Sequence, residues 1–169
     1  MKRIALISTG GTIEKTYDEL SGVLQNRVSV LDVMLATLQL RGVQIDRVAL
    51  MNKDSLDMSE ADHNLIATTA AHYAATHDGV VIVHGTDRLA KTGHRLVERL
   101  NTPRVPIVLT GAIRPWEMRS TDALQNLTEA LLAVQLLAPG VYVSMHNNVL
   151  QFPGVEKDPK AGAFVKRCE

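Results

Sequence analysis

Short apolar runs alternate with longer amphipathic runs along most of this chain. Parallel strands that are buried on both faces read as nearly continuous apolar runs, because helices cover the sheet from both sides. Five runs have this character and predict central strands: Arg3 to Ser8, Gln44 to Leu50, Gly79 to His84, Pro106 to Thr110 and Gly140 to Met145. The alternation predicts an α/β domain of three layers, with a mainly parallel central sheet flanked by helices.

The amphipathic segments between these runs predict helices at about Ser29 to Leu40, Ser59 to Thr76, Leu89 to Leu100 and Asp122 to Leu137. Ser59 and Asp62 have the spacing of a capping box, which satisfies free N–H groups in the first turn of a helix. Thr121 stands where a capping residue is expected for the last segment. From about Gln151 the periodicity is lost, so we expect a loop there, or an element that waits for a partner.

Composition and charge narrow the class of protein. The chain has 169 residues, of which 46% are hydrophobic, and a domain usually takes roughly 150 residues, so we expect one domain over 1–169. Eighteen basic residues balance 18 acidic ones, which argues against nucleic acid and membrane surfaces as partners. The apolar runs are too short for a signal peptide or a membrane span. The single cysteine, Cys168, has no intramolecular partner and suits a reducing compartment, so we expect a cytoplasmic protein.

Glycines, hydroxyls and carboxylates follow four of the five predicted strands. These residues are Thr9-Gly10-Gly11-Thr12, Asp54-Ser55, His84-Gly85-Thr86-Asp87 and Gly111-Ala112-Ile113-Arg114-Pro115. In an open α/β sheet, ligands bind beyond the carboxyl ends of the strands. The sequence therefore predicts a small-molecule site at this edge of the sheet.

The loop after the first strand offers a nucleophile beside two glycines. Gly10 and Gly11 allow a sharp turn with free backbone N–H groups, and Thr12 follows as a candidate nucleophile. In the alternative interpretation, the glycines only make a turn and Thr12 caps it. The spacing fits neither a phosphate loop nor a dinucleotide-binding fingerprint.

The other loops are also open to two interpretations. Asp87 could hold a substrate ammonium group or cap the following helix, and Ser55 could belong to a polar turn. His84 follows a buried strand and is expected to be a hydrogen-bonded core histidine. The spacing of His and Cys residues does not predict a zinc site.

A threonine nucleophile needs a base or a neighbouring cation, because its hydroxyl is protonated at neutral pH. Lys157 could reach back over the strand ends, although a lysine in such a polar tail is more often a solvated surface residue. Tyr17 lies in the loop after Thr12, where its phenol could relay a proton or simply pack on the surface.

The segments Thr9 to Ile13 and His84 to Asp87 resemble the two signature motifs of the bacterial-type L-asparaginase and glutaminase family. A third block, Gly111 to Pro115 followed by Ser120-Thr121-Asp122 and Asn126-Leu127, is similar to another part of its pattern. The order and spacing agree from about residue 2 to Phe164. The resemblance implies the fold of the large N-terminal domain of these enzymes, with no counterpart of their smaller C-terminal domain in 1–169.

The resemblance implies no metal and no organic cofactor, and it also implies roles for individual residues. Thr12 would attack the side-chain amide carbon of L-asparagine, release ammonia and leave an acyl-enzyme that water hydrolyses to aspartate. Thr86, Asp87 and Lys157 would form a charge-coupled set beside the substrate. Asp87 would bind the α-ammonium group and Ser55 the α-carboxylate.

Further positions are implied in the same way. Tyr17 matches a flexible-loop tyrosine, and Lys160 is the fallback for the active-site lysine. The N–H groups around Gly11 and Thr86 would stabilise the oxyanion. Leu56 departs from the family pattern, because many members carry Gln there.

The preferred interpretation is an L-asparaginase that acts on a free amino acid and forms a homo-oligomer, a dimer or tetramer, through sheet edges and apolar helix faces around Val134 and Leu137. A related amidohydrolase, such as a glutaminase or an enzyme for a larger amide, stays open because one methylene changes binding by only about 1 to 3 kcal/mol. A non-catalytic amino-acid-binding module also stays open. Such a module would need Ser55 and Asp87, but not Thr12 or Lys157.

Overall fold

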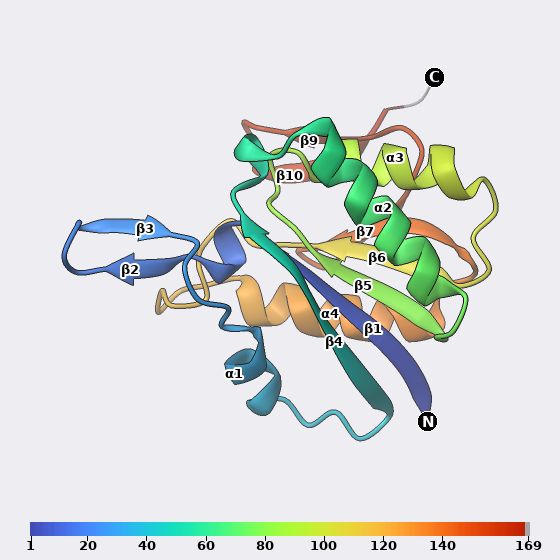
Figure 1. Cartoon of the computed structure of the whole chain (residues 1–169), viewed down its shortest axis with the longest axis horizontal. Coiled ribbons are helices and arrows are strands. Elements are labelled where there is room, and N and C mark those ends of the chain that lie inside the picture. Colours follow the sequence, from blue (N-terminus) through green and yellow to red (C-terminus); the bar gives the residue numbers. More distant parts are fainter. Residues whose placement is uncertain (168–169) are drawn as a thin grey trace.

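A six-stranded sheet in the order β4-β1-β5-β6-β7-β8 forms the centre of the molecule (Figure 1). The structure, a computed structural model, describes residues 1–167, so the expectation for Cys168 lies outside the described residues. The strands are β1 (Lys2–Gly10), β4 (Val43–Lys53), β5 (Gly79–Val83), β6 (Pro106–Thr110), β7 (Gly140–Met145) and β8 (Asn148–Gln151). All neighbours are parallel except β7 and β8, which confirms the mainly parallel sheet.

Helices cover both faces of this sheet, as the sequence predicts (Figure 1). The core on one face includes side chains of α2 (Glu60–Ala74) and α3 (Leu89–Leu100). The core on the other face includes side chains of α1 (Leu31–Ala36) and α4 (Ala123–Leu136). The side chain of Ser59 accepts the Asp62 N–H, and Asp62 accepts the Ser59 N–H, so the predicted capping box is confirmed. No helix within residues 1–167 has the length and apolar character that a bilayer crossing demands.

The first helix is shorter than the predicted Ser29 to Leu40. Ser29 lies outside it because its hydroxyl bonds the Glu14 carboxyl group. Thr37 ends the helix, and its hydroxyl bonds the Met34 carbonyl. Leu31 and Met34 of this helix are fully buried, and Leu38 and Leu40 pack against the same core from the segment that follows it.

The tail after Gln151, which we expected to be a loop or an element that waits for a partner, is an antiparallel ribbon. It consists of β9 (Val155–Asp158) and β10 (Ala163–Lys166), which pair Lys157 with Phe164. Each strand is four residues long and buries one apolar side chain, Val155 or Phe164, which leaves too little alternation for sequence reasoning to detect. Phe152 anchors the ribbon on α3, since a Cβ on Gly93 would lie 2.2 Å from the Phe152 ring.

The segment around Tyr17 forms a hairpin that projects from the body of the molecule (Figure 1). Its strands are β2 (Thr16–Asp18) and β3 (Val23–Gln25), and they pair Tyr17 with Leu24.

Val134 is completely buried, so it cannot serve the oligomer contact that the sequence suggested. A Cβ on Gly79 would lie 2.6 Å from a Val134 methyl group, which shows that this side chain faces the sheet. The exposed apolar side chains of α4 are Leu132 and Leu136 instead.

Candidate active site

The ends of the parallel strands bring the four predicted loops to one edge of the sheet. Ser8 of β1 is level with Val83 of β5, and Val83 is level with Thr110 of β6. The end of β4 is longer, and Gly10 pairs there with Lys53 across a register shift in β1. The loops therefore begin side by side, as the sequence predicts.

Glycines let these loops touch through their backbones. Gly11 has a φ of +82°, and a Cβ on it would lie 2.4 Å from the Gly85 Cα. A Cβ on Gly85 would lie 2.7 Å from the Ser55 Cβ, and one on Gly111 would lie 2.3 Å from the His84 carbonyl oxygen. No side chain fits in these contacts, so the four loops pack as one unit.

Thr12 begins a 3₁₀ turn, Thr12–Glu14, directly after the contact between Gly11 and Gly85. Gly11 itself has a packing role, because its N–H donates to the Lys53 carbonyl at 2.8 Å. The N–H groups of Thr12 and Thr86 have no acceptor among residues 1–167. These two N–H groups are therefore among those that a ligand oxygen could use.

Lys157 lies over the residues that follow β5. Its Nζ donates to the Thr86 hydroxyl at 2.8 Å and pairs with an Asp87 carboxylate oxygen at 2.6 Å. Val155 and Lys157 share one face of β9, because alternate residues of a strand point the same way. Val155 is fixed in the core, and its carbonyl accepts a hydrogen bond from His94, so the ribbon holds Lys157 in place. The Lys157 side chain is 18% exposed and that of Asp87 is 49% exposed, so the pair opens to solvent on the Asp87 side.

Ser55 is buried in the second 3₁₀ turn, Ser55–Asp57. Its hydroxyl accepts the backbone N–H of Arg88 at 3.3 Å, and its Cβ packs against Gly85. Leu56, the next residue, is 55% exposed. Ser55 thus ties the loop after β4 to the loop after β5.

Residues 3–160 match the family model described as "Asparaginase, N-terminal". The chain belongs to the asparaginase family. An L-asparaginase from Thermococcus kodakarensis is 31% identical over 157 residues, covering 92% of this chain and 47% of that protein. A component of the glutamyl-tRNA(Gln) amidotransferase from Haloquadratum walsbyi is 37% identical over 145 residues, covering 85% of this chain and 33% of that protein.

A solved structure supports the same relationship. The thermostable L-asparaginase from Thermococcus kodakarensis superposes with a TM-score of 0.86 and 30% sequence identity, covering 97% of this chain and 51% of that chain. This asparaginase-family chain therefore spans between about a third and a half of the length of these relatives. The fold of an asparaginase N-terminal domain, expected from the sequence, is confirmed.

Two residues named as site candidates lie apart from the Lys157 group in this asparaginase-family chain. Tyr17 is 60% exposed on the projecting hairpin, and its N–H donates to the Glu117 carboxylate. Lys160 is exposed in the turn between β9 and β10, where its N–H bonds the Asp158 carboxylate. The geometry favours Lys157 over Lys160 beside Thr86.

An ion pair that sequence reasoning missed joins the first two loops. Lys15 Nζ lies 2.6 Å from an Asp54 carboxylate oxygen, and the other oxygen accepts the Leu56 N–H. Burial raises the pKa of Asp54, but the hydrogen bonds from Lys15 and Leu56 outweigh it and leave the pKa below its usual value. The opposite charges of Lys15 and Asp54, close in sequence to Thr12 and Ser55, were a signal for this ion pair. The two residues are 39 positions apart, so the sequence alone did not show that they meet.

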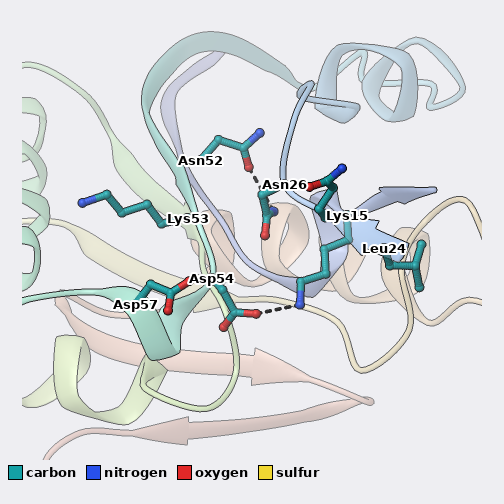
Figure 2. A pocket seen from close by; sticks show the side chains of 8 residues that line it. Lys15, Leu24, Asn26, Asn52, Lys53, Asp54 and Asp57 are labelled. Atoms are coloured by element: carbon teal, nitrogen blue, oxygen red, sulfur yellow. Dashed lines mark hydrogen bonds and ion pairs between the residues drawn. The ribbon is translucent and has the colours of Figure 1, made fainter. Parts of the chain in front are cut away.

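This ion pair borders a hollow of about 340 Å³ at the base of the hairpin. Figure 2 shows Lys15 and Asp54 pointing toward each other, while Lys53 points away. Asn26 donates to the side-chain oxygen of Asn52 at 3.0 Å on another wall. The hollow is polar and adjoins the loops that carry Thr12 and Ser55.

Two buried carboxyl groups, those of Glu14 and Asp122, form hydrogen bonds that fix the loops after β1 and β6. Glu14 accepts the Gly10 N–H and bonds Ser29, and burial raises the pKa of its carboxyl group. Asp122 accepts the N–H groups of Ile113 and Arg114, which fixes the loop after β6. Burial raises the pKa of Asp122, but these N–H groups and His146 outweigh it and lower the pKa overall.

His84 is a hydrogen-bonded core histidine, as expected. It is fully buried, and its Nδ1 lies 2.8 Å from the Gly85 carbonyl oxygen. Burial lowers the pKa of its ring to about 4. Within residues 1–167, no three His, Cys, Asp or Glu side chains cluster in a way that could hold a metal ion.

Proposed function

We propose that this protein is an L-asparaginase that hydrolyses L-asparagine to L-aspartate and ammonia through Thr12. The observation that carries the proposal is the contact of Lys157 Nζ with Thr86 and Asp87, in loops that pack against the Thr12 turn. A threonine nucleophile needs a basic or charged neighbour that accepts its hydroxyl proton or favours its loss. A hydroxyl, an ammonium and a carboxylate in one group provide that chemistry.

The reaction proceeds in two halves. The Thr12 oxygen attacks the side-chain amide carbon, and the negative charge that develops on the amide oxygen is held by the N–H groups of Thr12 and Thr86. The C–N bond then breaks, and the nitrogen leaves as ammonia with the proton that Thr12 loses. Water attacks the remaining ester, aspartate leaves, and a proton returns to Thr12.

Thr86 and Lys157 carry protons during both halves. The Thr86 oxygen accepts a hydrogen bond from Lys157, so its own proton is free to be donated within the site. Asp87 balances the charge of Lys157, and its exposed side also suits a substrate ammonium group. Ser55 belongs to the α-carboxylate side of the pocket, and Tyr17 would join the site only if the hairpin moved toward it.

The proposed setting is a cytoplasmic homo-oligomer. The single cysteine of the chain favours a reducing compartment. Exposed apolar side chains on α4, Leu132 and Leu136, favour association.

Similarity to a component of a glutamyl-tRNA(Gln) amidotransferase favours a second candidate function. In that case the chain would release the amide nitrogen of glutamine or of a larger amide for use with a partner. The same Thr12 chemistry would operate, and the difference would lie in the substrate pocket. A module that only binds an amino acid is the third candidate.

Ammonia release from L-asparagine, L-glutamine and D-asparagine, measured in parallel, tests these candidates. We expect release from L-asparagine that Thr12→Ala and Thr86→Val both abolish. Release from L-glutamine alone would support the amidotransferase-like function. No release by folded protein that still binds aspartate would contradict hydrolysis and support the binding module.

A further inference from the structure

A row of buried hydrogen bonds connects α2 to the loop that carries Thr86. His63 Nδ1 lies 2.7 Å from the Thr92 hydroxyl oxygen, and that oxygen lies 2.8 Å from His84 Nε2. His84 Nδ1 lies 2.8 Å from the Gly85 carbonyl oxygen. The side chains of His63, Thr92 and His84 are fully buried, so water does not compete for these bonds.

The Gly85 carbonyl, at one end of the row, determines which atom donates and which accepts in every hydrogen bond. The Gly85 carbonyl can only accept, so His84 Nδ1 carries a hydrogen. Burial lowers the pKa of His84 to about 4, so the ring is neutral and Nε2 is an acceptor. The single hydroxyl hydrogen of Thr92 must then point to His84, and the Thr92 oxygen accepts from His63 Nδ1.

His63 ends the row with a vacant lone pair. Its Nε2 is buried without a hydrogen-bond partner within residues 1–167. The row leaves the hydrogen of this ring on Nδ1, so Nε2 is an unprotonated acceptor. An unpaired N–H group at this position would cost more to bury. Burial also lowers the pKa of His63, which keeps this ring neutral.

We propose that Thr92 and His84, with His63 behind them, are positioning residues that aim the Thr86 N–H into the active site. In a trans peptide the C=O group and the following N–H point in opposite directions. His84 holds the Gly85 carbonyl toward the core, so the N–H of Thr86 points away from it, and this N–H has no acceptor among residues 1–167. The assignment to catalysis rests on the proposed hydrolase function, in which this N–H stabilises the oxyanion.

Nitrogen-detected NMR of histidine-labelled protein tests the bond directions without any measurement of activity. The spectra distinguish a ring protonated at Nδ1 from one protonated at Nε2. We expect both His63 and His84 to be neutral and protonated at Nδ1 at neutral pH. A wild-type His84 protonated at Nε2 would overturn the proposal, even if every variant failed to fold.

Thr92→Val removes the hydroxyl in the middle of the row and keeps the shape of the side chain, whereas Thr92→Ser keeps the hydroxyl. We expect Thr92→Val to shift the Thr86 amide resonance and to lower kcat about tenfold while KM stays within about twofold, because the oxyanion donor acts in the transition state. Thr92→Ser is expected to restore both values. A merely structural role for Thr92 would lower stability without this separation of kcat from KM.

A folded Thr92→Val protein with an unchanged Thr86 amide resonance and unchanged kcat would overturn the positioning role. If the wild-type protein released no ammonia from any amide, the proposed function would fail by itself. The histidine protonation and the response of the Thr86 amide to Thr92→Val would still decide whether the row aims this N–H.

Discussion

Lys157 lies 71 residues beyond Thr86 in the chain, yet its Nζ lies 2.8 Å from the Thr86 hydroxyl oxygen. Lys160, three residues later, is exposed and makes no such contact. The two lysines therefore form a matched pair for testing the role of the contact with Thr86 and Asp87.

Lys157→Met retains the length of the side chain and removes its charge. We expect it to lower kcat for L-asparagine by about 10²-fold or more, because a group that transfers protons in the reaction contributes about 10²- to 10⁴-fold to the rate. Lys160→Met should leave kcat within about twofold. Equal activity in the two variants would contradict the role given to Lys157.

His84 makes stability depend on pH in a definite direction. Its folded pKa of about 4 lies below the ordinary value of 6.5, because burial penalises the charged ring. The unfolded chain therefore binds a proton at this residue before the folded protein does. The stabilisation is fully present above about pH 6.5 and is lost as the pH falls toward about 4, by at most about 3 kcal/mol.

Urea unfolding between about pH 7 and pH 4 measures this effect. His84→Asn keeps a side-chain N–H donor without an ionisable ring, so we expect it to be less stable at pH 7 but to lose less stability on acidification. An identical loss in both proteins would show that His84 is not responsible.

At the scale of single residues, sequence reasoning named the polar groups but not their partners. Thr86, Asp87 and Lys157 were candidates, and the structure brings them together. Lys15 was missed, because its pairing with Asp54 depends on how the two loops pack in three dimensions.

The loop that follows β1 depends on glycine for two separate reasons. Gly11 has a positive φ, and a Cβ there would lie 2.4 Å from the Gly85 backbone. Gly22, in the hairpin, also has a positive φ, but nothing lies within 4 Å of a Cβ placed there. Gly11 therefore combines a strained backbone with a close contact between loops, whereas Gly22 has the strained backbone alone.

Gly22→Ala should therefore cost only about 1 kcal/mol of unfolding free energy and leave activity unchanged. Gly11→Ala should cost about 3 kcal/mol or more and abolish activity, because the Thr12 loop must move away from Gly85. Chemical unfolding and ammonia release measure both effects. A fully active Gly11→Ala protein would contradict the close packing of the loops.

Elements with strong local signals could be predicted from the sequence. The central strands could be found from their apolar runs, and Ser59 gave the start of α2 through its capping box. The ribbon β9–β10 could not be found, because each strand buries a single apolar side chain, Val155 or Phe164. Their burial depends on contacts of β9 with α3 and of β10 with β7 and β8. The short α1 likewise depends on the contact between Ser29 and Glu14.

At the scale of the molecule, the candidate site combines segments that lie far apart in the chain. β1 and its turn supply Thr12, the middle of the sheet supplies Thr86 and Asp87, and the terminal ribbon supplies Lys157 (Figure 1). The strand and helix patterns of the sequence predict the three-layer order. The return of the ribbon over the sheet edge depends instead on tertiary packing. Burial of Phe152 against Gly93 on α3 anchors that return.

The central claim is that Thr12 carries the acyl group during hydrolysis. Rapid acid quenching of the protein with L-asparagine, followed by mass spectrometry of its peptides, tests this claim most directly. We predict an aspartyl adduct on the peptide that contains Thr12, absent from Thr12→Ala and present in a control variant, Thr128→Ala, whose hydroxyl bonds its own helix on α4. An adduct on Thr86 instead, or undiminished ammonia release by Thr12→Ala, would contradict the account.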